Sequence, residues 1–161
     1  MGTHKLSVRV YYEDTDFSGF VYHASYLRFM ERGRTELLRE LGLLQRDLAL
    51  SEPAGALFFV VRAMDIDFRR PAYMDDLLSV ETRVEAVGGA SFTMGQEIRR
   101  DDALLTAARV TVALISNRKP QRLPAVIREK FERLLDGRAG GRAGLADGGL
   151  GRTEQKSPTA K

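Results

Sequence analysis

The sequence predicts an α+β domain in which one long helix packs on an antiparallel sheet. Two observations support this prediction. Apolar residues recur with a helical period through residues 23–41, and four strand-like segments then follow one another across short turns. Strands without intervening helices pair antiparallel, and one amphipathic helix then covers a face of the sheet. A chain of 161 residues is long enough for one domain with its own core.

A half-buried strand is expected at residues 6–12, where every second residue is apolar. An acidic turn follows, with Asp14 and Asp16 ahead of Ser18-Gly19, the pair expected at its tightest point. We expect Asp14 to be the structural acid of the two, as the acceptor of an Asx turn. Taken without the surrounding sequence, Asp16 would likewise be interpreted as a turn or N-cap residue only.

The long helix is expected to start at His23, with Gly42 as its C-cap. Its apolar face is formed by Tyr26, Phe29, Met30, Gly33, Leu37 and Leu41. Gly33 on that face allows a close approach to the sheet. The first N–H groups of such a helix have no partner within it and carry partial positive charge, so they can stabilise an anion.

The four later strands follow a connector at residues 43–56, which holds a short helical piece and the Pro53 break. They are expected at residues 57–68, 77–87, 92–99 and 104–115, with Gly88-Gly89 as a hairpin turn. Residues 58–61 are apolar on both sides, as in a central strand, so the other face or an edge of the sheet should need a partner. We therefore expect a homodimer at least. A short helix at residues 125–135 completes the domain.

Composition excludes several classes of function. The sequence has no cysteine, which excludes disulfides, thiolate metal sites and a cysteine nucleophile, and fits a reducing compartment. No stretch approaches the roughly 18 apolar residues of a membrane span, and no apolar run indicates a secretory signal. We expect a cytoplasmic protein without an integral membrane segment.

The net charge of +3 does not indicate nucleic-acid binding. Five basic and two acidic residues follow residue 136, so residues 1–136, the predicted domain, carry 20 of each and are neutral. Residues 137–161 hold the excess and seven of the 15 glycines, which predicts a disordered basic tail. A solvated appendage is favoured over weak contact with a membrane or a nucleic acid.

No metal or other cofactor is expected. Asp14, Asp16 and Ser18-Gly19 imitate the start of an EF-hand loop, but the twelfth position is Ser25 and not Glu, and no helix precedes the loop. The two histidines, His4 and His23, are not at zinc spacing.

Several blocks of sequence together match one known family. They are residues 8–16 (VRVYYEDTD), Gly19, residues 21–26 (VYHASY), Glu31-Arg32-x-Arg34-Thr35-Glu36, residues 59–62 (FVVR), Pro71-Ala72 and Asp75-Asp76. Over roughly residues 6–135 the sequence resembles the hotdog-fold acyl-CoA thioesterases of the 4-hydroxybenzoyl-CoA thioesterase type. Within these it is most similar to the subgroup associated with the bacterial Tol–Pal system. Phe17-Ser18 and Phe20 stand where the family usually has smaller residues. These differences bear on the shape of the acyl pocket and not on the chemistry.

The resemblance implies a five-stranded antiparallel sheet wrapped around one long helix, with homodimers joined edge to edge, often homotetramers, and active sites at the subunit interface. It implies hydrolysis of acyl-CoA to free acid and CoA. Asp16 would be the general base or the nucleophile, and the backbone N–H of His23 would polarise the thioester carbonyl. This agrees with the chemistry, because a thioester needs an activated nucleophile and donors for the developing oxyanion.

Further site residues are expected beside this pair. The side chains of Tyr22 and His23 are catalytic candidates. The alternatives are that Tyr22 is a core aromatic and that His23 only stacks near the start of the helix. Glu31 is expected to pair with a helix arginine and not to assist catalysis. Gly19 and Val21 are substrate-binding candidates. The CoA phosphates have five basic candidates, of which the last two also fit a solvated loop: Arg62, Arg69, Arg70, Arg118 and Lys119.

Two other functions are weighed against the thioesterase. A hotdog dehydratase acting on acyl-carrier-protein substrates would use the side chains of His23 and Glu31 and leave Asp16 idle. An interaction module docking on acyl carrier protein or on lipid-synthesis enzymes would need no carboxylate beside an anion-stabilising helix end. The intact acidic turn therefore favours the enzyme.

Overall fold

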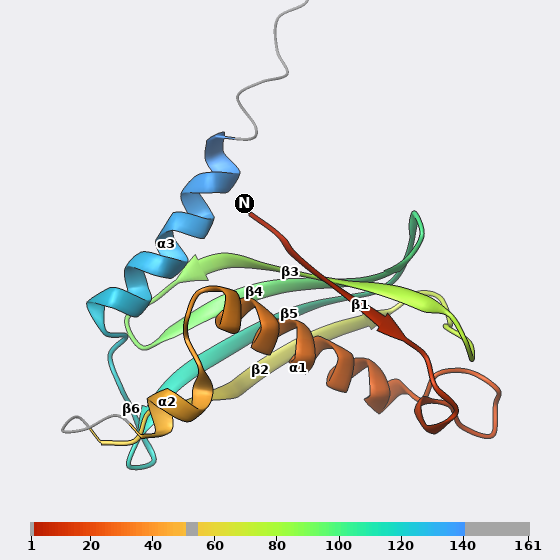
Figure 1. The fold of residues 1–161 in the computed structure, drawn as a ribbon, viewed down its shortest axis with the longest axis horizontal. Coiled ribbons are helices and arrows are strands. Elements are labelled where there is room, and N and C mark those ends of the chain that lie inside the picture. Colours follow the sequence, from red (N-terminus) through yellow and green to blue (C-terminus); the bar gives the residue numbers. More distant parts are fainter. Residues whose placement is uncertain (1, 51–54, 141–161) are drawn as a thin grey trace, which may run out of the picture.

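The computed structural model describes residues 2–50 and 55–140, and in it a curved antiparallel sheet wraps around one long helix (Figure 1). The helices are α1 (His23–Glu40), α2 (Gln45–Ala49) and α3 (Ala125–Gly140). The strands are β1 (His4–Arg9), β2 (Phe58–Phe68), β3 (Leu77–Val87), β4 (Ser91–Arg100), β5 (Ala103–Ser116) and the two-residue β6 (Lys119–Pro120). The predicted α+β class with five long strands, one long helix and a C-terminal helix is confirmed.

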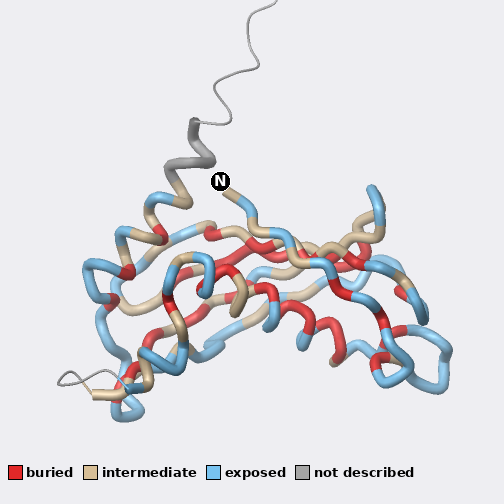
Figure 2. Tube along the Cα trace, in the orientation of Figure 1, coloured by how far each residue is buried: buried red, intermediate tan, exposed pale blue. Residues whose placement is uncertain are grey.

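The order of the long strands is β1-β3-β4-β5-β2, so β1 and β2 form the two edges. This corrects the prediction that residues 58–61 belong to a central strand. In the described chain Phe58, Val60 and Val61 are between 36% and 50% exposed, and Figure 2 shows β2 largely exposed along the lower edge of the sheet. An apolar run indicates that both faces of a strand are to be covered, but it does not say by which chain.

The helix α1 lies on the concave face of the sheet as its apolar period predicts. Phe29 and Met30 are fully buried against the sheet. A Cβ atom on Gly33 would lie 2.8 Å from the hydroxyl of Thr82 and 2.9 Å from a methyl of Val80. The close approach predicted at Gly33 is therefore confirmed, and a side chain there would push the helix off the sheet.

A polar group separates the hydrophobic core into two clusters. The side-chain amide of Gln96 donates to the backbone carbonyl of Met30 and to Thr82, both at 2.9 Å, and its oxygen accepts from Arg34 at 2.8 Å. One cluster lies under the first half of α1, and the other lies under its second half and α3. These buried bonds set the position of α1 along the sheet, because each polar atom would lose its partner if the helix slid.

Element ends differ from prediction by more than one residue in two elements. The first strand ends at Arg9 and not at residue 12, because the next residues form a 3₁₀ turn at Tyr12–Asp14 that leaves Tyr12 83% exposed. The last helix runs to Gly140, so the predicted domain boundary at residue 136 falls inside α3. The predicted close of α1 is confirmed, with Gly42 in the left-handed region at φ +71°. Pro53 and residues 141–161 of the predicted tail lie outside the described residues.

Candidate active site

Asp14 holds the acidic turn together from the inside. Its carboxylate is 5% exposed and accepts the N–H of Tyr11 at 2.8 Å, while its backbone carbonyl accepts the N–H of Tyr22 at 2.8 Å. The structural role predicted for Asp14 is therefore confirmed. The predicted Asx turn is not, because the structure places that turn at Asp16.

Asp16 is exposed and keeps one carboxylate oxygen free. Its Oδ1 accepts the N–H of Ser18 at 2.8 Å and also the Ser18 hydroxyl. These two bonds hold the pKa of Asp16 below its ordinary value, and the nearby His23 adds to the effect. In the described part of the chain Oδ2 has no hydrogen-bond partner. Gly19, at φ +82°, closes this turn by donating its N–H to the Asp16 carbonyl at 3.0 Å. At neutral pH Asp16 thus presents an ionised oxygen to solvent.

The start of α1 presents backbone donors beside this carboxylate. Tyr22 is the N-cap residue, and its side chain makes no capping hydrogen bond. Among residues 2–50 and 55–140, no acceptor is bonded to the N–H groups of His23 and Ala24. Such groups carry the partial positive charge of the helix dipole, so they suit an oxygen that gains negative charge.

An open cavity of about 230 Å³ lies at this end of α1. It is lined by Phe20, Val21, His23, Tyr26, Phe68, Arg69, Arg70 and Pro71. The His23 ring stands edge-on to Phe68 with the ring centres 6.4 Å apart, and the Tyr26 hydroxyl accepts the N–H of Ala72 at 2.9 Å. Burial raises the pKa of Tyr26, so its hydroxyl stays neutral. Four of the predicted site residues are thus together: Val21, His23, Arg69 and Arg70.

Other predicted site residues are not part of the cavity lining, and these include Asp16 and Gly19 in the acidic turn just before it. The Tyr22 side chain is 43% exposed, stacks edge-on to His23 at 4.5 Å and is neither a core aromatic nor part of the lining. Arg62 is exposed beside the irregularity between Val61 and Ala63 in β2. Arg118 lies in the β5–β6 turn and Lys119 directly after it, at the opposite end of the sheet in Figure 1.

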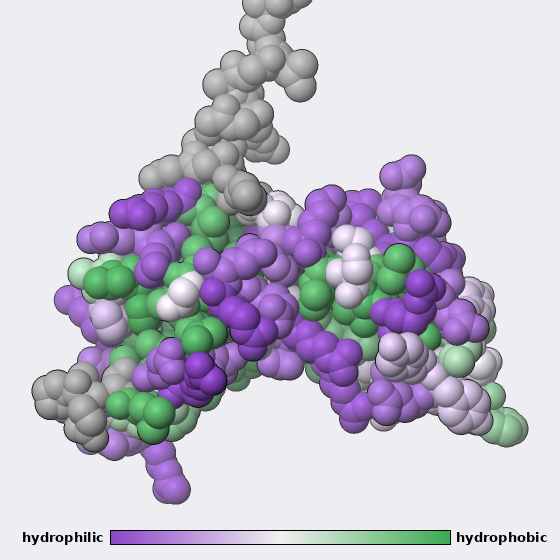
Figure 3. Space-filling view, in the orientation of Figure 1, coloured by the Kyte–Doolittle hydropathy of each residue, from purple (hydrophilic) through white to green (hydrophobic). Residues whose placement is uncertain are grey.

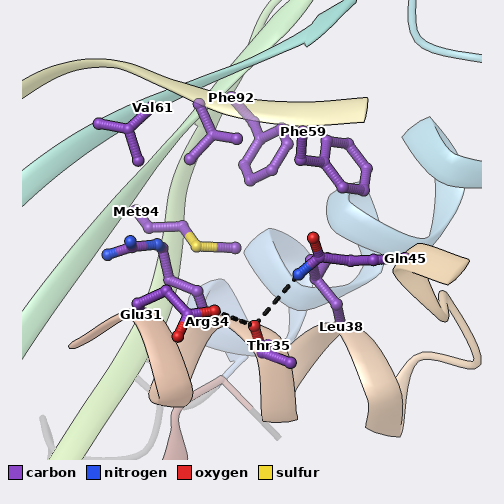
Figure 4. A pocket seen from close by; sticks show the side chains of 10 residues that line it. Glu31, Arg34, Thr35, Leu38, Gln45, Phe59, Val61, Phe92 and Met94 are labelled. Atoms are coloured by element: carbon purple, nitrogen blue, oxygen red, sulfur yellow. Dashed lines mark hydrogen bonds between the residues drawn. The ribbon is translucent and has the colours of Figure 1, made fainter. Parts of the chain in front are cut away.

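A second cavity, of about 110 Å³, was not predicted from sequence (Figure 4). It lies between α1 and the strands at the β2 edge. Its apolar lining consists of Leu38, Phe59, Val61, Phe92, Met94 and Val112, and its polar lining consists of Glu31, Arg34, Thr35 and Gln45. These residues span positions 31 to 112 of the chain, so no local pattern groups them. The periodicity of α1 does show that Glu31, Thr35 and Leu38 share one side of the helix.

The polar side of this cavity is a chain of hydrogen bonds. Gln45 donates to the Thr35 hydroxyl at 3.1 Å, and Thr35 donates to Glu31 at 2.7 Å. The predicted ion pair of Glu31 with a helix arginine is therefore wrong: within the described residues Glu31 has no cation within ion-pair distance. Burial lowers the pKa of Arg34, which leaves a half-buried guanidinium bonded to Gln96.

Neither a metal site nor a membrane span is visible in the described residues. No group of three or more His, Cys, Asp or Glu side chains comes together there. No helix in residues 2–50 and 55–140 is both long enough and apolar enough to cross a membrane.

The fold and this site together define a hotdog domain with a free carboxylate beside an unpartnered helix start. The chain belongs to the thioesterase superfamily, whose family model matches residues 18–107. The acyl-CoA thioesterase YbgC of Haemophilus influenzae is 44% identical over 129 residues, which cover 79% of this chain and 93% of that protein. The YbgC acyl-CoA thioester hydrolase of Escherichia coli O6:H1 is 41% identical over 128 residues, 78% of this chain and 92% of that protein.

A solved structure gives the same result. A probable thioesterase from Bartonella henselae is 50% identical to this chain and superposes with a TM-score of 0.73, covering 76% of this chain and 99% of the other. This chain is therefore a hotdog-fold thioester hydrolase.

Proposed function

We propose that this chain hydrolyses acyl-CoA thioesters, with Asp16 as the catalytic carboxylate and the start of α1 as the oxyanion site. One observation carries the proposal: a free, ionised oxygen of Asp16 lies in the turn that leads to two unpartnered N–H groups, those of His23 and Ala24. The relatives named as acyl-CoA thioesterases support the choice of substrate.

The reaction needs three steps from these groups. Asp16 accepts a proton from water as the oxygen of that water bonds to the thioester carbon, or it bonds to that carbon itself. The carbonyl oxygen becomes negative and is stabilised by the N–H groups of His23 and Ala24. The C–S bond then breaks and CoA leaves as a thiolate, so no strong general acid is required. In the second route water cleaves the resulting anhydride.

We further propose a homodimer that pairs through the free edge of β2. This edge is eleven residues long, and apolar side chains on it are exposed. A long apolar edge with unpaired N–H and C=O groups is unstable in water and is normally covered. A second copy of β2 covers it with the same surface, as twofold symmetry requires.

In such a dimer the cavity at the β2 edge completes the site of the other subunit. Phe68 lies beside His23 at one end of β2, and Phe59 lines the second cavity at the other end. Antiparallel pairing across a twofold axis places the start of one β2 opposite the end of the other. The acyl group held at His23 of one subunit then enters the apolar cavity of its partner.

Finer assignments rest on the sequence blocks alone. Residues 8–16, 21–26 and 31–36 support placement among the 4-hydroxybenzoyl-CoA thioesterase type and its Tol–Pal-associated subgroup. The absence of cysteine from the sequence supports a cytoplasmic location. Acyl carrier protein is the alternative carrier, since it presents the same thioester.

The test is release of free thiol from acetyl-, butyryl-, palmitoyl- and benzoyl-CoA by the wild type, Asp16→Asn and Asp75→Asn. Asp75 is a matched control because it is also an exposed acid in a turn, with φ +68°, which Asn adopts readily. We expect Asp16→Asn to lose at least about 1000-fold in kcat with an unchanged fold, and Asp75→Asn to stay within twofold of wild type.

Three other outcomes are informative. Full activity in Asp16→Asn contradicts its catalytic role. Hydrolysis of acyl-carrier-protein thioesters without hydrolysis of acyl-CoA would make acyl carrier protein the carrier, in place of CoA. After a single turnover in ¹⁸O-water, label in Asp16 indicates the anhydride route. Label in the released acid alone results either from general base catalysis or from attack of water on the acyl carbon of the anhydride.

A further inference from the structure

The end of the molecule that holds the acidic turn is covered by exposed aromatic side chains. They come from residues 11–22 and 73–77, which lie together at the right-hand end of Figure 1. Six large side chains of these segments, which we call the aromatic patch, are each at least 42% exposed: Tyr11, Tyr12, Phe17, Phe20, Tyr73 and Met74. A contiguous exposed group of large apolar side chains marks a surface that contacts something else.

Contacts between the two segments hold the aromatic patch in place. Phe20 and Tyr73 pair as a single antiparallel bridge, and their rings stand edge-on with the centres 5.4 Å apart. The N–H of Asp75 donates to the carbonyl of Val10 at 3.1 Å, and the N–H of Val10 donates to the carbonyl of Asp76 at 2.9 Å. The rings therefore form one surface before any partner binds, which lowers the entropic cost of binding.

Phe17 forms the apex of the patch. Its side chain is completely exposed, because the turn beneath it is closed by the N–H of Gly19 on the carbonyl of Asp16 at 3.0 Å. A ring that projects from a tight turn needs a partner that can surround it. A fluid lipid surface deforms in this way, whereas a rigid protein surface would need a matching hollow.

The charges within the patch have one sign. Residues 11–22 and 73–77 contain no lysine or arginine, and Glu13, Asp16 and Asp75 are exposed there. In the described residues none of these three carboxylates has a cation within ion-pair distance, whereas Asp76 is paired with Arg100 at 2.6 Å. Aromatic faces and carboxylates both attract ammonium groups. The ammonium group is the outermost charge of a zwitterionic phospholipid, while an acidic protein would be repelled.

The patch borders the catalytic cavity and stays clear of the proposed dimer edge. Phe20 belongs both to the patch and to the cavity lining. Leu77 pairs with Arg9 of β1, and β3 is three strands away from β2, which is about 14 Å. Pairing through β2 does not reach this part of the patch. It remains free beside the opening through which an acyl group enters.

We infer that the aromatic patch docks on a zwitterionic phospholipid surface. The Phe17 ring enters the boundary between headgroups and acyl chains, and Glu13 and Asp75 face the ammonium groups. Tyr and Phe suit this boundary because their rings are apolar and the phenol is polar. Long-chain acyl-CoA partitions into the same surface through its chain, so docking brings the catalytic cavity to its substrate. This delivery rests on the proposed function, and the docking itself does not.

The first test uses the lack of tryptophan in the sequence. Phe17→Trp places a single fluorescent reporter at the apex of the patch. On addition of phosphatidylcholine vesicles we expect its emission to shift to shorter wavelength, and lipids brominated on the acyl chain to quench it. Val126→Trp, at an exposed apolar position of α3, is the matched control and should show neither effect.

Two results of this test would count against the inference. An unchanged emission of Phe17→Trp in the presence of vesicles overturns it. A larger shift with phosphatidylglycerol than with phosphatidylcholine vesicles overturns the assignment of a zwitterionic headgroup, because the carboxylates of the patch should be repelled by an anionic one.

The second test is cosedimentation of the full chain with phosphatidylcholine vesicles. In Tyr12→Ser/Phe17→Ser we expect the partition coefficient to fall at least about tenfold, because two apolar rings are lost. The melting temperature should stay near that of wild type, since both side chains are exposed. Val126→Ser should bind as wild type does. Equal binding of the double variant overturns the inference. A wild type that ignores vesicles but forms a larger oligomer than the double variant would make a second copy the occupant instead.

A third measurement separates docking from the proposed function. The rate with palmitoyl-CoA in phosphatidylcholine vesicles is divided by the rate with butyryl-CoA in solution for each variant. We expect this ratio to fall about tenfold in Tyr12→Ser/Phe17→Ser, in parallel with vesicle binding, and to stay unchanged in Val126→Ser. An unchanged ratio despite lost binding contradicts the delivery of substrate. If the wild type hydrolyses no acyl-CoA, the proposed function fails, and the two binding tests still decide the docking.

Discussion

In the proposed β2 dimer, the two ends of β2 carry complementary halves of one site. At the Phe68 end, the structure has a free carboxylate oxygen on Asp16, two unpartnered N–H groups and an open cavity. At the Phe58 end, it has a mostly apolar cavity, and Arg118, Lys119 and Arg122 there have no carboxylate within ion-pair distance among the described residues. Figure 3 shows hydrophobic side chains toward both ends of one face, with hydrophilic side chains between them. In the proposed dimer the site needs both ends, so the free edge between them is the surface that would join the two subunits.

The two edges of the sheet show which of them is available for pairing. The edge strand β1 is six residues long, and its Lys5 and Arg9 bond to Glu81 and to the Asp75 carbonyl. Short edges with charged side chains resist pairing with other chains. The β2 edge is eleven residues long and begins with four apolar residues. The difference supports the proposal that two copies of the chain pair through β2.

After Asp16→Asn, the largest effect is expected from removing a single N–H at the catalytic end. In His23→Pro the N–H is removed at the first helical position, where proline fits without disturbing the helix. We expect kcat to fall about 100- to 1000-fold with little change in melting temperature. His23→Ala, which keeps the N–H and loses the ring, is the control and should lose far less. Equal losses in the two variants would assign the effect to the imidazole.

The next largest effect is expected from separating the two subunits of the proposed dimer, which removes the Phe58 end of one β2 from the Phe68 end of the other. Val60→Lys puts a charge on the exposed side of the β2 edge, and Ser7→Lys makes the same change on β1. We expect Val60→Lys to sediment as a monomer and to lose about 100-fold in kcat/KM, because half of each site is no longer positioned. Ser7→Lys should retain both the wild-type mass and its rate. A fully active Val60→Lys monomer would show that one subunit holds a complete site.

A smaller effect is expected from filling the second cavity, at the Phe58 end of β2. Val61→Phe adds bulk to the cavity from the edge strand, where Val61 is half exposed, so the core is not overpacked. We expect kcat/KM for butyryl- or benzoyl-CoA to fall about tenfold, and that for acetyl-CoA to fall less than twofold. The ratio of the substrates within one variant is the measurement. Equal losses for all substrates would place the acyl group elsewhere.

The smallest effect concerns the pKa of Asp16. Ser18→Ala removes the hydroxyl that contributes most to lowering this pKa, so the pKa rises toward its ordinary value. Hydrolysis needs the ionised carboxylate, which is lost as the pH falls through that pKa. The acid limb of the kcat/KM profile should therefore move to higher pH, with little change at neutral pH. If the acid limb does not move, the ionisation that sets it belongs to a group other than Asp16.

Local features of the site were predictable, and the arrangement around it was not. The turn at Ser18-Gly19 and the hairpin at Gly88-Gly89 follow from local turn chemistry, with Gly19 at positive φ. The close contact at Gly33 follows from the missing side chain. The Asx turn was assigned to the wrong acid, because two carboxylates two residues apart present the same local signal. The ion pair of Glu31 was also wrong, since a neighbouring threonine competes for the same oxygen.

The sequence by itself determined the α+β class, the span and buried face of α1 and the acidic turn ahead of it, because periodicity and turn chemistry act over a few residues. Only the tertiary structure decided that β2 is an edge, that Arg118 and Lys119 lie far from Asp16, and that residues 31 to 112 enclose a second cavity. These depend on strand order and register, which are set by contacts between residues far apart in the chain. A run of apolar residues has the same appearance whether its own sheet or a second subunit covers it.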